Sequence, residues 1–155
     1  MANGDIRWFA QGLLDLGNKI HDLDSDNLRV GFITSAVTPA LGDAAPHWGG
    51  TGTTNFNTSE VTGTGGNYPA EGYVLVSVSW SLVSNVPTLR ATDISIAQHA
   101  SNPTDARWGI VYNNTDANKR AIGFLDFGSV RDLTSGAFTF NFGGSGTDLL
   151  TLTQS

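Results

Sequence analysis

The sequence contains no cysteine, which excludes disulfides, thiolate nucleophiles and cysteine-based zinc or iron sites. Charged residues are also scarce, at 14% of the chain against about 25% in typical domains. Basic residues are the rarer sign, with 8 Lys and Arg against 14 Asp and Glu and a net charge of -6. Because nucleic-acid binders gain affinity by placing Lys and Arg on phosphates, we expect no nucleic-acid partner.

Long hydrophobic runs are missing as well. No apolar stretch approaches the roughly 18 to 20 residues that cross a bilayer. The first residues, MANGD, carry no basic region of the kind that begins a signal peptide. We therefore expect no membrane partner and no signal peptide.

The residues that usually carry out catalysis do not form a recognisable motif. His21, His47 and His99 lie far apart in the sequence, without the spacing of a metal-binding pair. The GGSG run at 143–146 is not the Gly-x-Ser-x-Gly turn of a serine nucleophile. The Gly/Thr-rich part of the chain lacks the lysine of a phosphate-binding loop. We expect a protein that is not an enzyme, with no catalytic residue and no cofactor.

One acidic cluster is a weak candidate for a metal site. Asp22, Asp24 and Asp26 alternate as at the start of a calcium-binding loop. However, Asn27 stands where that loop needs its glycine, and Ile33 where it needs its glutamate. The pattern favours polar turn residues between a helix and a strand over calcium ligands.

The N-terminal segment has helical periodicity. Its apolar residues recur at three- and four-residue spacing, namely Ile6, Phe9, Ala10, Leu13, Leu16 and Ile20. This pattern predicts one amphipathic helix over residues 5–20, with Asp5 as its N-cap. So short a helix is marginal by itself, so we expect it to pack on the sheet or on a neighbouring subunit.

After this helix the apolar period changes to two, which is typical of strands. The expected strands lie near 28–33, 73–83, 92–96, 108–112, 122–125, 138–142 and 149–152. The longest, 73–83, is expected to bury Val74, Val76, Val78, Trp80 and Leu82. Hairpin turns are expected at 113–118 and 143–146. Strands with frequent turns and no intervening helix predict a mainly β fold, a single antiparallel β-sandwich or barrel-like domain over residues 1–155. Residues 73–153 would form its main scaffold.

A Gly/Thr-rich tract covers residues 42–66. Structureless loops of this length are uncommon in compact domains unless they are functional or disordered. Two interpretations stay open: a flexible loop, or an arm that becomes ordered on a partner. Trp48, Phe56 and Tyr68 are the interface candidates for such an arm.

Aromatic residues in the strands allow two interpretations. Trp80, Trp108 and the series Phe138, Phe140 and Phe142 resemble the stacking platform of a carbohydrate-binding module. Their alternation within strong strands favours core positions instead.

Several segments together resemble small structural proteins of tailed bacteriophages, in particular capsid decoration (cement) proteins. These are QGLLDL at 11–16, DSDNLRVGFITS at 24–35, VSVSW at 76–80, LRATD at 89–93, ARWGIVY at 106–112, IGFLDFG at 122–128 and FTFN at 138–141. The resemblance implies a protein made in the host cytoplasm that binds the exterior of the virion capsid as a homotrimer and contacts the major capsid protein. It supplies no catalytic residue.

Three alternatives compete with capsid decoration. A phage tail component, either a tube or a tail-completion subunit, would also be β-rich and self-associating. A carbohydrate-binding or adhesin module and a small enzyme of another type are the remaining two. The expected contact surfaces are the N-terminal helix, the exposed strand edges and the tract at 42–66.

Overall fold

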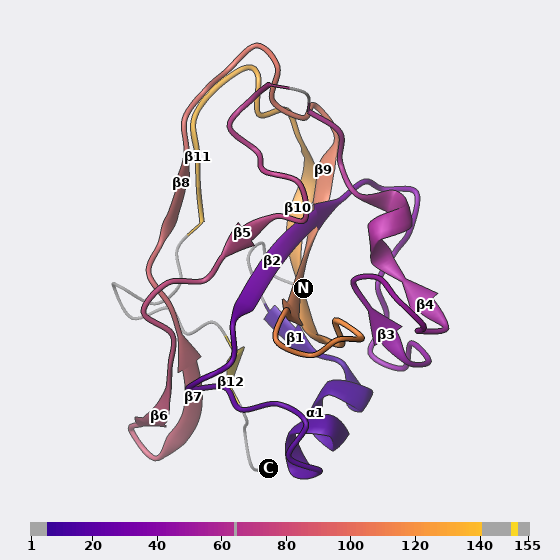
Figure 1. The fold of residues 1–155 in the computed structure, drawn as a ribbon. Helices are drawn as coiled ribbons and strands as arrows, with labels where there is room; N and C mark the ends of the chain where they lie inside the picture. Colours follow the sequence, from indigo (N-terminus) through magenta and orange to yellow (C-terminus); the bar gives the residue numbers. More distant parts are fainter. Residues whose placement is uncertain (1–5, 64, 141–149, 152–155) are drawn as a thin grey trace.

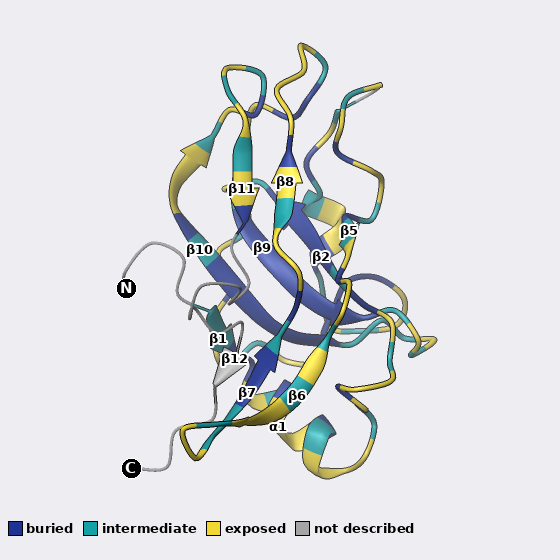
Figure 2. Ribbon diagram, turned by 90° about the vertical axis from the view of Figure 1, so that its left-hand side faces the viewer, coloured by how far each residue is buried: buried dark blue, intermediate teal, exposed yellow. Residues whose placement is uncertain are grey.

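A computed structural model describes residues 6–63, 65–140 and 150–151. The fold is mainly β, with antiparallel sheets and one α-helix, so the predicted fold class is confirmed. The strands form a sandwich-like arrangement rather than a closed barrel. Figure 2 shows the two layers, with β11, β8, β7 and β6 in front of β10, β9 and β2.

The back layer is a five-stranded antiparallel sheet in the order β1-β10-β9-β2-β5. Its strands are β1 (Ile6–Trp8), β10 (Ala121–Arg131), β9 (Ala106–Asn113), β2 (Leu28–Ile33) and β5 (Tyr73–Val74). Almost every residue of β2 and β9 is buried, on both faces of the sheet. Such strands need cover on both sides, and two separate hydrophobic clusters supply it.

The front layer supplies the cover on one side. It contains β12 (Leu150–Thr151), β7 (Val86–Arg90) and β6 (Ser79–Val83) in one sheet, and β11 (Phe138–Phe140) with β8 (Ile94–Ile96) in another. Phenylalanine rings fill the space between the layers: Phe32 contacts Phe127, Phe138 and Phe140 at centroid distances of 5.1, 6.3 and 5.9 Å. Trp108 and Phe140 are buried, which confirms the expectation of core positions for these two aromatic residues.

The tract at 42–66 supplies much of the cover on the other side. It contains β3 (Pro46–His47), β4 (Thr54–Asn55) and the 3₁₀ helix η1 (Phe56–Ser59), and β3 and β4 pair in parallel. Trp48 and Phe56 belong to the second cluster, with Phe9 and Tyr112. In this structure the rings of the tract pack on the central sheet and bury apolar area that a free loop would expose.

The N-terminal segment begins as a strand and not as a helix. β1 pairs with β10, with Ile6 opposite Leu125 and Trp8 opposite Gly123. The helix α1 follows at Ala10–Gly17, so the predicted helix over 5–20 is too long at both ends. Ile6 and Trp8 alternate as in a strand, and the open edge of β10 supplies the hydrogen bonds. The proposed cap at residue 5 lies outside the described residues.

The predicted strand 73–83 is broken into β5 and β6. Ser77 between them has a φ of 53°, in the left-handed region and outside the φ range of a regular β-strand. Val74, Val76 and Leu82 are exposed, so the expectation that they lie on one buried face is wrong. At this break the chain passes from the five-stranded sheet to the sheet that contains β6. The alternation of buried and exposed side chains therefore does not continue from β5 into β6.

Strand pairing near the C-terminus also differs from the expected hairpin. β11 pairs with β8 and β12 pairs with β7, so these two strands face different partners. The turn predicted at 143–146 lies outside the described residues. The hairpin predicted at 113–118 is confirmed, since β9 and β10 are joined there and pair along most of their length.

Candidate functional site

The acidic cluster forms a hydrogen-bonded turn. The Asp22 N–H donates to Asp26 Oδ2 at 2.8 Å, and the Asp24 N–H donates to Asp22 Oδ1 at 3.2 Å. Hydrogen bonds, above all from the Ser25 side chain, lower the pKa of Asp22. Asp24 Oδ1 also accepts the backbone N–H of Trp80 at 2.7 Å. The carboxylates therefore serve backbone donors, and within the described residues no group of three or more acidic, His or Cys side chains is placed to hold a metal.

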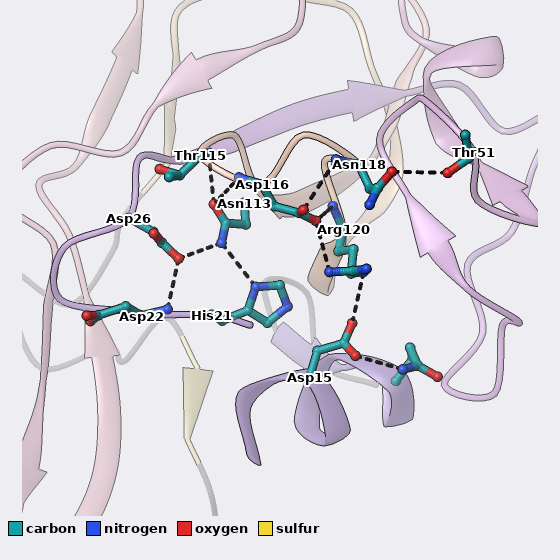
Figure 3. A network of polar contacts seen from close by, with 11 residues as sticks. Asp15, His21, Asp22, Asp26, Thr51, Asn113, Thr115, Asp116, Asn118 and Arg120 are labelled. Carbon is teal, nitrogen blue, oxygen red and sulfur yellow. Dashed lines mark hydrogen bonds and ion pairs between the residues drawn. The ribbon is translucent and has the colours of Figure 1, made fainter. Parts of the chain in front are cut away.

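Asn113 lies at the centre of a polar network that joins this turn to the β9–β10 hairpin (Figure 3). Its Oδ1 accepts the N–H groups of Thr115 and Asp116 at 2.9 and 3.2 Å. Its Nδ2 donates to Asp26 Oδ2 at 2.5 Å and to His21 Nδ1 at 3.2 Å. Because Oδ1 already accepts two backbone donors, the orientation of the amide is determined.

The orientation of Asn113 determines the protonation of His21. Its Nδ1 faces a donor, so it must accept, and the neutral ring then carries its hydrogen on Nε2. Burial lowers the pKa of His21, and the Arg120 charge acts in the same direction. The carboxylates of Asp15, Asp116 and Asp26 oppose this shift. His21 is therefore a buried neutral imidazole.

Asp15 and Arg120 connect the helix α1 to the same network. Asp15 is buried, accepts a hydrogen bond from Gln11 Nε2 at 2.8 Å, and lies 3.8 Å from Arg120 Nε. Arg120 also reaches Asp116 Oδ2 at 3.5 Å, and its backbone forms a bridge with His47 of β3. The network thus holds together α1, the acidic turn, the hairpin and β3, and its central side chains are buried.

A second group of charges lies near the start of β5. Glu71 pairs with Arg29 at 3.1 Å and with Lys119, and its backbone oxygen accepts the Tyr112 hydroxyl at 2.7 Å. Glu60 Oε1 accepts the Glu71 N–H at 2.6 Å, and burial raises the pKa of Glu60. These contacts connect the tract at 42–66 to the central sheet.

The three aromatic interface candidates lie inside the protein. Trp48 stacks on Tyr112, with centroids 5.1 Å apart and an interplanar angle of 4°. Phe56 stacks on Phe9 at 5.5 Å. The hydroxyl of Tyr68 accepts the Phe32 N–H at 2.9 Å and donates to Glu60 at 3.1 Å, and burial raises its pKa. All three are buried core residues in this fold, so none of them presents its ring on the surface.

Large aliphatic side chains are exposed instead. One group consists of Leu13 and Leu14 of α1 with Leu41, whose backbone oxygen accepts the Ala10 N–H at 2.9 Å; we call it the α1 surface. Leu82 of β6, at 69%, has the largest exposure among these side chains. The alternation of apolar residues predicted a core position for Leu82. The sequence signal for this exposed apolar site is the run 72–89, which contains no Asp, Glu, Lys, Arg or His.

The fold and these contacts define a mainly β protein whose polar networks hold loops together and whose surface carries several exposed aliphatic side chains. No helix in the described parts of the chain is long and apolar enough to cross a membrane. No protein-family model, curated protein or solved structure matches the chain.

Proposed function

We propose that this chain is a non-catalytic virion structural protein that binds the exterior of a tailed-bacteriophage capsid and stabilises the shell. It acts in this proposal as a homotrimer that contacts the major capsid protein. The resemblance of the sequence segments to decoration proteins supports the assignment. The observation that supports a contact with the capsid is the α1 surface, where the side chains of Leu13, Leu14 and Leu41 are 39%, 56% and 47% exposed.

The helix that carries this surface is held firmly. A Cβ on Gly12 would lie 2.5 Å from the Ile122 backbone oxygen, so α1 approaches β10 closely. Buried Asp15, beside Arg120, fixes the same face. Leu13 and Leu14 are thereby presented outward without the cost of ordering a loop on binding.

Binding to expanded shells from the same source tests the proposal. We expect the protein to sediment with the shells and to raise the temperature at which they disrupt. Leu14→Lys should weaken binding about tenfold, because it puts a charge into an apolar contact. Val130→Lys is the matched control, since Val130 is 48% exposed on β10.

Failure of the unmodified protein to bind shells would contradict the proposal. Equal loss in both variants would assign the effect to charge and not to the α1 surface. Light scattering of dilute protein supplies the subunit number: a discrete trimer is expected, and open-ended polymers would indicate a tail tube.

A further inference from the structure

Among the described residues, one edge of the strand β6 is open. β6 is the last strand of the sheet β12-β7-β6, and β7 is the only described strand that pairs with it. The N–H of Trp80 donates to Asp24, which is not part of the sheet, so this amide points away from β7. Every second residue of an antiparallel strand points the same way, so the N–H and C=O of Leu82 also face the open edge.

The chemistry of this edge is unusual for an exposed strand. Proteins commonly protect such edges with Lys, Glu, Asp or Pro, because an open edge accepts another strand. Residues 79–83 of β6 are Ser, Trp, Ser, Leu and Val, and the whole run 72–89 is uncharged. At 69% exposure, Leu82 leaves an apolar side chain beside unprotected backbone groups.

The absence of charge at the β6 edge favours β6 of a second copy as the strand that pairs with it. The chain has a net charge of -6, so two copies repel each other across most of their surfaces. An uncharged edge is where close approach of two copies costs least. Antiparallel pairing of two copies centred on Leu82 puts Leu82 opposite Leu82 and Ser81 opposite Val83, with no charged residue on either side.

We propose that two copies of this chain pair through the open edges of β6, antiparallel and centred on Leu82. The contact is isologous, with the same residues on both sides of a twofold axis. It goes beyond the proposed capsid binding and does not depend on it.

Asp24 limits the length of this pairing. Its carboxylate already occupies the N–H of Trp80, so the paired segment ends before that residue. So short a contact lies below the roughly 1,200 Å² of a stable interface, and isolated copies associate weakly. The contact gains strength where many copies are held close together. Asp24, a candidate metal ligand from the sequence, here protects a strand edge.

Cysteine crosslinking tests the pairing directly, because the chain has no other cysteine. Directly opposite residues in a hydrogen-bonded antiparallel pair have Cα atoms about 5.5 Å apart, within the range of a disulfide. Leu82→Cys should form covalent dimers on mild oxidation about tenfold faster than Leu14→Cys, because association raises the local thiol concentration. Both parent side chains are exposed, so Leu14→Cys is the matched control. Equal rates would overturn the proposal.

The role of Asp24 has a test of its own. Asp24→Ala releases the Trp80 amide and should increase self-association in sedimentation velocity. Asp24→Asn keeps an oxygen acceptor and should behave like the unmodified protein. Adding Leu82→Lys to Asp24→Ala should abolish the increase, and an increase that persists would overturn pairing at this edge. Shell binding does not enter either measurement, so failure here and failure of the proposed function are distinguishable.

Discussion

Gly31→Ala should destabilise the protein through a single contact. A Cβ at position 31 would lie 2.2 Å from Cη2 of Trp48, so the indole ring has to move. The same ring stacks on Tyr112 and is nearly fully buried. The added methyl therefore opposes docking of the tract at 42–66 on the central sheet.

The magnitude follows from the two interactions at stake. Overpacking of a well-packed core costs about 1–3 kcal/mol. Loss of the Trp48–Tyr112 stack adds about 0.5–1.5 kcal/mol. A total of about 3 kcal/mol in a domain of this size corresponds to a decrease in Tm of about 6–12 °C.

Thermal unfolding followed by circular dichroism measures the effect, and tryptophan fluorescence reports on the environment of the indole rings. Gly17→Ala is the control, because no heavy atom outside its chain neighbours and the backbone of its own helix lies within 4 Å of the added Cβ, and Tm should stay the same or rise slightly. In a Trp48→Leu background the ring atoms that clash are gone, so Gly31→Ala should cost much less. An unchanged Tm for Gly31→Ala, or a full cost in the Trp48→Leu background, would refute this account.

Further expectations concern the polar network. Since the pKa of His21 is lowered in the folded protein, the unfolded chain binds more protons, and stability should fall as pH decreases below the ordinary histidine value of about 6.5. His21→Gln should reduce this pH dependence in denaturant titrations. The remaining dependence is due to His47, because burial lowers its pKa as well. A pH profile identical to that of the unmodified protein would contradict the role of His21. Asn113→Ala should cost on the order of 3 kcal/mol, because it leaves the buried His21 and the part-buried hydrogen bonds of Asp26 and Thr115 without their partner, whereas Asn114→Ala should cost little. A chelator should leave Tm unchanged, because the carboxylates of the acidic turn serve backbone donors; a lower Tm would restore the metal hypothesis.

The sequence alone was sufficient for the features that depend on local pattern. Alternation and turn residues predicted the mainly β class, the strand β2 and the hairpin between β9 and β10. The turn preference of Asp, with Asn27 and Ile33 in place of the glycine and glutamate of a calcium loop, favoured a turn at the acidic cluster, and its hydrogen bonds have that character. These features depend on interactions between residues that are close in the sequence, so the pattern of residue types is enough to predict them.

Only the tertiary structure decided where distant segments meet. Trp48 is a core residue because Gly31, on the strand β2, has no Cβ and leaves room for the ring. Residues 6–8 form a strand because β10 has an edge to pair with. Leu82 is exposed because the chain changes sheets near Ser77 and carries the end of β6 past Trp80 away from the core. Each outcome depends on a partner that is remote in sequence, and local periodicity contains no information about that partner.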